Sequence, residues 1–150
     1  MEGAAQHFRF NRRLVDSLYI DAMVLADEAR SYFDDYGRAE RDILAPVARV
    51  GFSCESIKVT TRLMHVIAWL LTQRAVAAGE LSAAAARDPS RRLGDAPLTD
   101  AEALIAMPAS ARALIRASIE LHRRVAVLDA EEAAAPSPAR AMLDRLALAF

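Results

Sequence analysis

The sequence is poor in residues that interrupt helices and in residues that build most metal sites. Among 150 residues there are 5 glycines, 6 prolines and a single cysteine, Cys54. One cysteine excludes an internal disulfide and a cysteine-based zinc site of the usual four-ligand kind. The three histidines, His7, His65 and His122, fall on three different predicted segments. We therefore predict no metal site and no cofactor.

The chain also lacks an excess of charge of either sign. Nineteen basic and 20 acidic residues give a net charge of −1, so net charge creates no field that would collect nucleic acid or anionic lipid. The longest apolar stretch, residues 63–71, is far shorter than the ~20 residues of a membrane span. The first twenty residues show no secretory signal. We predict a cytoplasmic protein without nucleic-acid or membrane partners.

Motifs that carry catalysis are missing as well. The chain contains no glycine-rich phosphate loop, paired-histidine zinc motif or nucleophile elbow. Cys54 lies on an apolar stripe of a predicted helix, where a buried cysteine behaves as a small hydrophobic residue. His65 lies one helical turn from Arg62 and from Trp69, which favours a structural role. An enzyme is therefore disfavoured.

What the sequence does contain is alanine and helical periodicity. Apolar residues recur at spacings of three and four in segments of about 11–36, 46–78 and 109–135. Pro46 and Pro108 suit first turns, and Gly37 and Gly79 suit helix ends. We predict an all-α fold, an antiparallel three-helix bundle with a long central helix and short helices in the connector and at the C-terminus.

The segments between and after these helices define the expected domain organisation. We predict a single helical domain over residues 1–150, with a core of about 11–132, a mobile connector of about 86–99 and an amphipathic tail over 136–150. Within the connector, Thr99 and Glu102 form a possible capping box for a short helix. The tail either docks on the bundle and completes its core, or forms a detachable apolar handle for a partner.

The central helix is apolar on more than one side. One stripe comprises Cys54, Ile57, Thr61, Met64, Ala68, Leu71 and Ala75. A second stripe comprises Val59, Leu63, Val66, Leu70 and Ala77. Two stripes predict packing against two neighbours in the chain, and they leave room for a second copy of the chain.

Several polar residues are candidates for binding other proteins. Glu55, Lys58 and Arg62 lie along one side of the central helix at helical spacing. They form either exposed ion pairs or an interfacial cluster in which Arg62 reaches a carboxylate on another helix or subunit. In the connector and tail, the candidate partner-docking residues are Arg87, Arg91, Arg92, Leu146, Leu148 and Phe150.

A longer motif resembles a known family. The stretch "ESIKVTTRLMHVIAWLLTQRAVAAGE", residues 55–80, is similar to the signature of the alphaproteobacterial regulators of CtrA degradation, a family long described as a domain of unknown function. The matching residues are Glu55, Ser56, Thr60, Thr61, Arg62, Leu63, Met64, Trp69, Leu70, Leu71, Gln73, Arg74, Ala75, Gly79 and Glu80. Weaker similarity extends the resemblance over most of residues 14–128.

The resemblance implies a fold and a function. It implies a three-helix bundle that forms a homodimer, has no catalytic residues and acts as an adaptor for the ClpXP protease. In that family a response regulator primes the unfoldase, and the adaptor docks on the primed complex to deliver cell-cycle regulators or further adaptors. The apolar C-terminal "RLALAF" departs from the polar extension typical of the family, so the role of the tail does not carry over.

Two hypotheses follow. The first is a dimeric adaptor in regulated proteolysis, with the outward side of the central helix at or near a subunit contact. Its candidate interface residues are Glu55, Lys58, Arg62, His65 and Trp69. The alternative is a small helical, transcription-associated regulator that binds DNA through residues 87–92.

Overall fold

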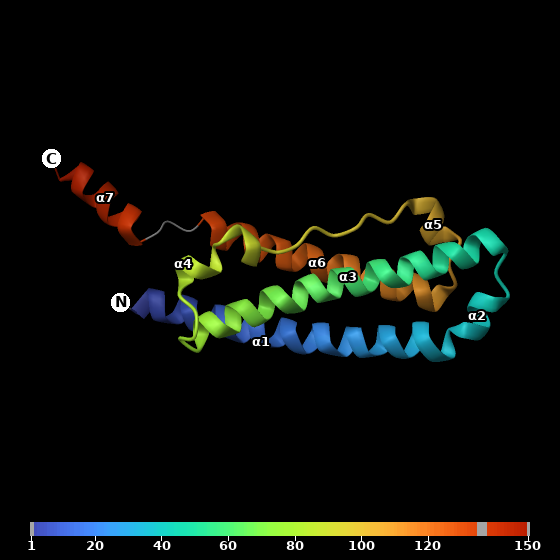
Figure 1. The fold of residues 1–150 in the computed structure, drawn as a ribbon. Helices are drawn as coiled ribbons and strands as arrows, with labels where there is room; N and C mark the ends of the chain where they lie inside the picture. Colours follow the sequence, from blue (N-terminus) through green and yellow to red (C-terminus); the bar gives the residue numbers. More distant parts are fainter. Residues whose placement is uncertain (1, 135–137, 150) are drawn as a thin grey trace.

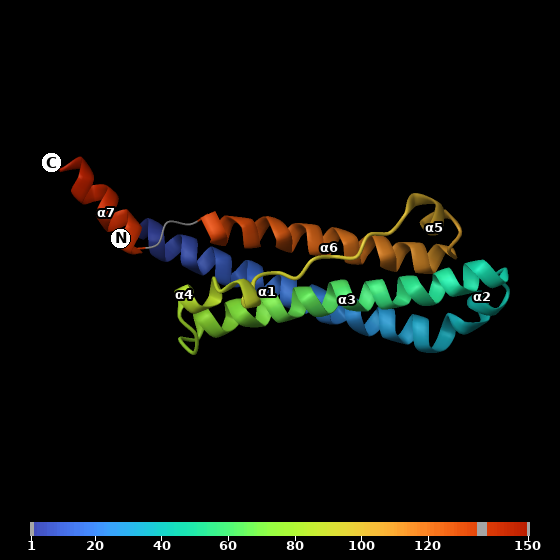
Figure 2. The ribbon, with the colours of Figure 1, turned by 45° about the horizontal axis from the view of Figure 1, so that its top comes forward.

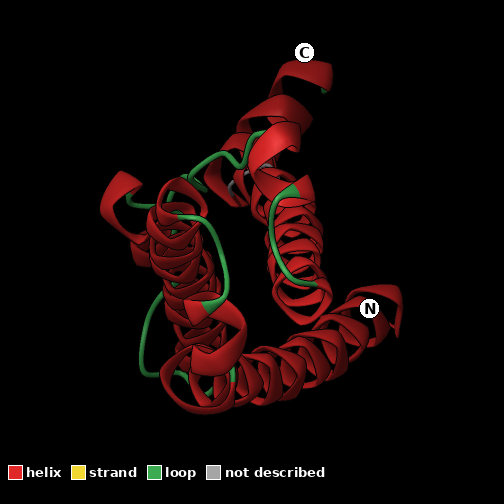
Figure 3. Ribbon diagram, turned by 90° about the vertical axis from the view of Figure 1, so that its right-hand side faces the viewer, coloured by secondary structure: helices red, strands yellow, loops and turns green. Residues whose placement is uncertain are grey.

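Three long helices dominate the computed structural model, which describes residues 2–134 and 138–149 (Figure 1). They are α1 (Glu2–Ser31), α3 (Pro46–Ala77) and α6 (Ala109–Ala134). The described residues contain helices and loops but no strand (Figure 3). The prediction of an all-α fold with a long central helix, α3, is confirmed.

The direction of α6 differs from the prediction. α3 runs antiparallel to α1, but α6 runs parallel to α3 (Figures 1 and 2). Two hydrogen bonds show that α3 and α6 are parallel. Arg62 bonds to Ser118, and Trp69, which comes later in α3, bonds to Asp129, which comes later in α6. Residues 79–108 therefore return along the length of the bundle before α6 begins.

This returning segment is more structured than the sequence indicated. It contains α4 (Ala83–Ala86), the 3-10 helix η2 (Pro89–Arg91) and α5 (Ala101–Ile105). Residues 92–100 are extended and lie beside α3 and α6 (Figures 1 and 2), and we call them the strap. The expected mobile connector is thus held along the bundle by bonds described below.

The core lies where the three helices face each other. It is built from apolar side chains at helical spacing, led by Leu18, Ala22, Val59, Val66, Leu70, Ile115 and Val125. Fully burying one large apolar side chain contributes about 1.5–3 kcal/mol, so this shared face supplies most of the stability. Ala22 and Ala111 have no exposed surface, and such small side chains let helices approach closely.

The far end of the bundle is closed by aromatic rings. α1 continues as a π-helical turn, η1 (Tyr32–Tyr36), followed by Gly37 and α2 (Arg38–Asp42). Phe33 packs edge to face against both Tyr32 and Phe52 of α3, and the Tyr32 ring lies tilted against Phe52. The Tyr32 hydroxyl donates a hydrogen bond to Glu40, which ties α2 to this end.

The opposite end carries the C-terminal helix. α7 (Pro138–Leu148) extends beyond the end of α6 (Figure 1). Its apolar residues Met142, Leu143 and Leu146 are exposed. Of the two arrangements considered for the tail, this conformation therefore shows the undocked one. Phe150, a predicted docking residue, lies outside the described residues.

Candidate functional site

The polar ladder of α3 is buried inside the chain. Arg62 is 0% exposed and Glu55 is 2% exposed. The Arg62 guanidinium donates to the Pro97 carbonyl at 2.9 Å and to the Thr99 hydroxyl at 2.6 Å. It also reaches the Ser118 hydroxyl at 3.3 Å, so a single side chain joins α3, the strap and α6.

Glu55 completes this cluster as the acceptor. The Thr99 hydroxyl donates to Glu55 at 2.7 Å, and Lys58 donates to Glu55 at 3.1 Å and to the Leu98 carbonyl at 2.7 Å. Desolvation lowers the pKa of Arg62, and the negative charge of Glu55 opposes that shift. The Thr99 hydroxyl bonds to Arg62 and Glu55 and does not cap a helix as the predicted capping box required. The N-cap residue of α5 is Asp100, which makes no side-chain capping bond.

Two histidines hold the same strap. His65 Nδ1 lies 3.0 Å from the Asp95 carbonyl, and His122 Nε2 lies 2.8 Å from the Gly94 carbonyl. A carbonyl only accepts, so each of these ring nitrogens must carry the proton. A Cβ built on Gly94 would lie 2.6 Å from the His65 ring, which explains why glycine stands at this position.

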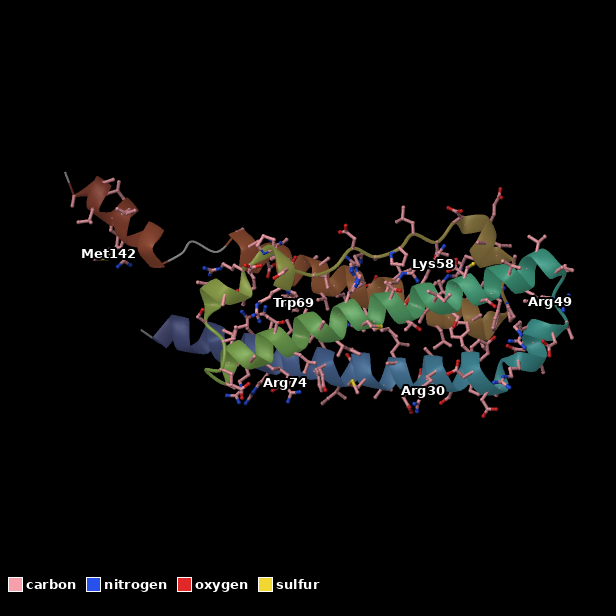
Figure 4. The ribbon with its side chains drawn as sticks, viewed as in Figure 1. Arg30, Arg49, Lys58, Trp69, Arg74 and Met142 are labelled. Carbon is pink, nitrogen blue, oxygen red and sulfur yellow. The ribbon has the colours of Figure 1, made fainter. Side chains whose placement is uncertain are left out.

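A second charged cluster anchors the start of the strap. Asp129 of α6 accepts from Trp69 Nε1 at 2.9 Å and from Arg92 at 2.8 and 2.9 Å. Burial by itself raises the pKa of Asp129, but the bonds from Arg92 and Trp69 outweigh burial and hold it below the usual value. Lys58 and Trp69 leave α3 on the side that faces the strap and α6 (Figure 4).

These positions revise the interpretation of the candidate residues. Arg62 and Trp69 were expected on the outward side of the central helix, but both point into the bundle. Arg92 is engaged by Asp129 instead of facing a partner. Arg91 is exposed and Arg87 is half-buried. A contact of Glu55, Lys58, Arg62, His65 or Trp69 with another subunit stays a prediction.

The outward side of α3 carries apolar residues instead. Cys54 is exposed, contrary to the prediction that it is buried. It belongs to a row of residues, here called the outer stripe, that comprises Val47, Val50, Cys54, Ile57, Thr61, Met64, Ala68, Leu71 and Ala75. All are exposed except Thr61 and Ala75, which are half-buried. Val47, Ile57 and Met64 are 85%, 66% and 63% exposed.

The spacing of the outer stripe is regular. Its members alternate steps of three and four residues without a break from Val47 to Ala75. Such a repeat over about four heptads is typical of a coiled-coil seam, in which one helix packs along another. Val47 and Val50 were missed in the sequence, although the same spacing extends back to them. The stripe is the candidate functional surface.

Metal binding and membrane insertion find no support in the described part of the chain. No group of three or more His, Cys, Asp or Glu side chains is placed to hold a metal ion within residues 2–134 and 138–149. None of the helices in these ranges is long and apolar enough to cross a membrane.

Comparisons with known proteins agree with the motif. A family model described as "Protein of unknown function (DUF1465)" matches residues 6–150. The solved structure of RcdA from Caulobacter crescentus CB15 aligns with a TM-score of 0.65 and 34% sequence identity, covering 79% of this chain and 90% of that chain. The comparison with curated proteins finds no match.

The buried arginine generates the first prediction. Replacing Arg62 by Ala removes its bonds to Pro97, Thr99 and Ser118. Each buried acceptor left without a partner costs about 1–3 kcal/mol, although Glu55 keeps its ion pair with Lys58. Arg62→Lys should rescue little, because an ammonium cannot reach Pro97, Thr99 and Ser118 together. Urea unfolding measures the loss. The exposed control Arg49→Ala should change stability by less than about 0.5 kcal/mol, and equal effects of both alanine variants would contradict the assignment.

Asp129 generates a pH prediction. Its pKa is lower in the folded chain, so its contribution is present above the unfolded value of about 3.9 and is lost as pH falls through the folded value. Asp129→Asn should therefore be much less stable than the parent at pH 7. The gap in unfolding free energy should narrow as the pH falls below the unfolded value of about 3.9. A gap that is constant with pH would refute this role of the carboxylate.

Proposed function

This chain belongs to the RcdA family, matched by the DUF1465 model, and on that premise we propose that it is a non-catalytic adaptor in regulated proteolysis. The relationship at 34% identity over most of both chains supports a role connected with proteolysis. The observation that carries the adaptor role is the outer stripe, an apolar surface that suits another protein and offers no enclosed site for a reaction.

The potentially reactive side chains support the same proposal. His65 and His122 are bonded to strap carbonyls, and Cys54 stands on the apolar outer stripe. Each group therefore has a position that packing or hydrogen bonding accounts for. A nucleophile needs a base within hydrogen-bond reach, whereas both histidines bond to carbonyl oxygens of the strap.

In more detail, the proposed adaptor docks on the ClpXP protease after a response regulator has primed its unfoldase. It then delivers cell-cycle regulatory proteins or further adaptors. This part of the proposal depends on the resemblance of residues 55–80 to the regulators of CtrA degradation. The exposed Arg91 and the exposed Leu146 and Leu148 of α7 are the candidate contacts for these partners.

The outer stripe is proposed as the contact between two copies in a homodimer. Val50, Ile57, Met64 and Leu71 from each copy give eight large side chains that are 47–66% exposed, so each can gain roughly half of the 1.5–3 kcal/mol of complete burial. That gain is of the same order as the cost of association, about 4–15 kcal/mol. Small residues at Cys54, Thr61 and Ala68 limit the area gained, which suits a reversible contact.

The dimer is tested by a charge in the middle of the stripe. Met64→Glu would place like charges against an apolar seam, so it should shift the chain to monomer at tens of micromolar in sedimentation equilibrium, while the parent is dimeric. Ala113→Glu adds the same charge to the exposed surface of α6 and should leave the dimer intact. A parent that is monomeric at this concentration, or a dimer that survives Met64→Glu, would contradict the proposed contact.

The adaptor role is tested with purified components. Immobilised full-length chain should retain the unfoldase ClpX only when the priming response regulator is present. Failure to retain it in both conditions would overturn the protease-adaptor proposal. Duplex DNA serves as the second arm, because the alternative DNA-binding regulator would bind it with an affinity that falls steeply with salt.

A further inference from the structure

A cavity of about 550 Å³ opens at the end of the bundle where α6 finishes. It is lined by side chains from the beginning of α1, the end of α3 and the end of α6, including Leu14, Trp69, Leu71 and Leu128. Acidic residues Glu80, Glu131 and Glu132 also line it. With Asp16 the lining has four acidic side chains, against the two arginines Arg12 and Arg74. The cavity thus combines apolar surface with a net negative charge, a composition that suits an amphipathic segment with a positive charge.

The helix α7 has the matching properties. Met142, Leu143 and Leu146 are spaced to share one side of the helix, and all three are exposed, Met142 to 66%. Arg145 lies in the same stretch and is exposed. Figure 4 shows Met142 on α7, well away from the three long helices. Nothing in the described part of the chain covers this apolar side, so α7 in this conformation lacks the packing that an amphipathic helix needs.

The short connection between α6 and α7 puts the cavity within reach of α7. α6 ends at Ala134 and α7 begins at Pro138, and connections this short usually join helices that pack antiparallel. A returning α7 of eleven residues would span roughly 16 Å, whereas Leu128 lies only about 9 Å back along α6 from Ala134. The returning helix would therefore pass over the cavity.

We propose that α7 folds back in the same chain and docks its Met142, Leu143 and Leu146 side in this cavity, with Arg145 near the acidic residues. The structure then represents the open state of a two-state element. A segment tethered three residues away has a high effective concentration, which favours it over an outside partner as the occupant. Docking requires neither a protease nor a second copy, although Leu71 and Ala75 belong both to the cavity lining and to the outer stripe.

Energy transfer from the only tryptophan tests the docking. Trp69 lines the cavity, and the only cysteine, Cys54, can be replaced by Ser so that Ala149→Cys carries a single acceptor dye. The full-length labelled chain should show strong transfer. Leu146→Asp on the docking side, or Ala83→Phe at the cavity, should reduce the transfer several-fold. Leu148→Asp is the matched control, because Leu148 lies on the opposite side of α7 and should leave transfer unchanged.

Two results would overturn the proposal. Equal transfer in the parent and in all three variants would show that α7 does not dock in the cavity. In a Met64→Glu background that keeps the chain monomeric, transfer that appears when a labelled Trp69→Phe chain is mixed with an unlabelled chain would place the helix in the cavity of another copy. Because no protease is present, neither result depends on the adaptor role.

Discussion

The structure depends on a guanidinium group that is completely withdrawn from water. A buried arginine is costly unless its charge and most of its N–H groups find partners. The terminal nitrogens of Arg62 donate to the strap and to α6, and Glu55 on the same helix supplies a negative charge, whereas Nε has no hydrogen-bond partner within the described residues. The Pro97 carbonyl of the strap can accept from Arg62 only because the strap runs back along α3 and α6. The buried arginine and the parallel orientation of α6 are therefore two aspects of one arrangement.

This arrangement decides which side of α3 remains available. The strap and α6 take the side that carries Glu55, Arg62 and Trp69, and α1 takes much of the rest of the core-facing surface. The remaining side is the outer stripe, which is apolar although it faces solvent. α3 thus buries two charged residues, Glu55 and Arg62, among apolar core residues, and it exposes an apolar stripe where a surface helix is usually polar. The proposed docking surface accounts for the apolar character of this exposed stripe.

Sequence reasoning located the helices because periodicity, Pro46 and Gly79 are local signals. Gly79 follows α3 with a φ of 77°, at the predicted helix end, whereas Gly37 has a helical φ of −79° instead of the left-handed conformation that its position suggested. The sequence did not distinguish buried from exposed residues where both have the same apolar periodicity. Both stripes of α3 are apolar, so spacing alone could not tell that Leu70 is buried and Met64 exposed. Likewise a ladder such as Glu55 and Arg62 is exposed in most helices, and only a distant strap buries it here. The available signal for a parallel α6 was the length of residues 79–108, because a connection this long can return along the bundle before the next helix begins.

The central claim is that the outer stripe joins two copies along α3. Disulfide scanning tests it most directly: in a Cys54→Ser background, single cysteines are placed at Ile57, Thr61, Met64, Ala68 and Leu71, and at the exposed off-stripe positions Arg49 and Arg123. The account predicts oxidative cross-linking of two chains at one or more stripe positions and at neither control. Cross-linking at none of the stripe positions, or equally at the controls, would contradict it.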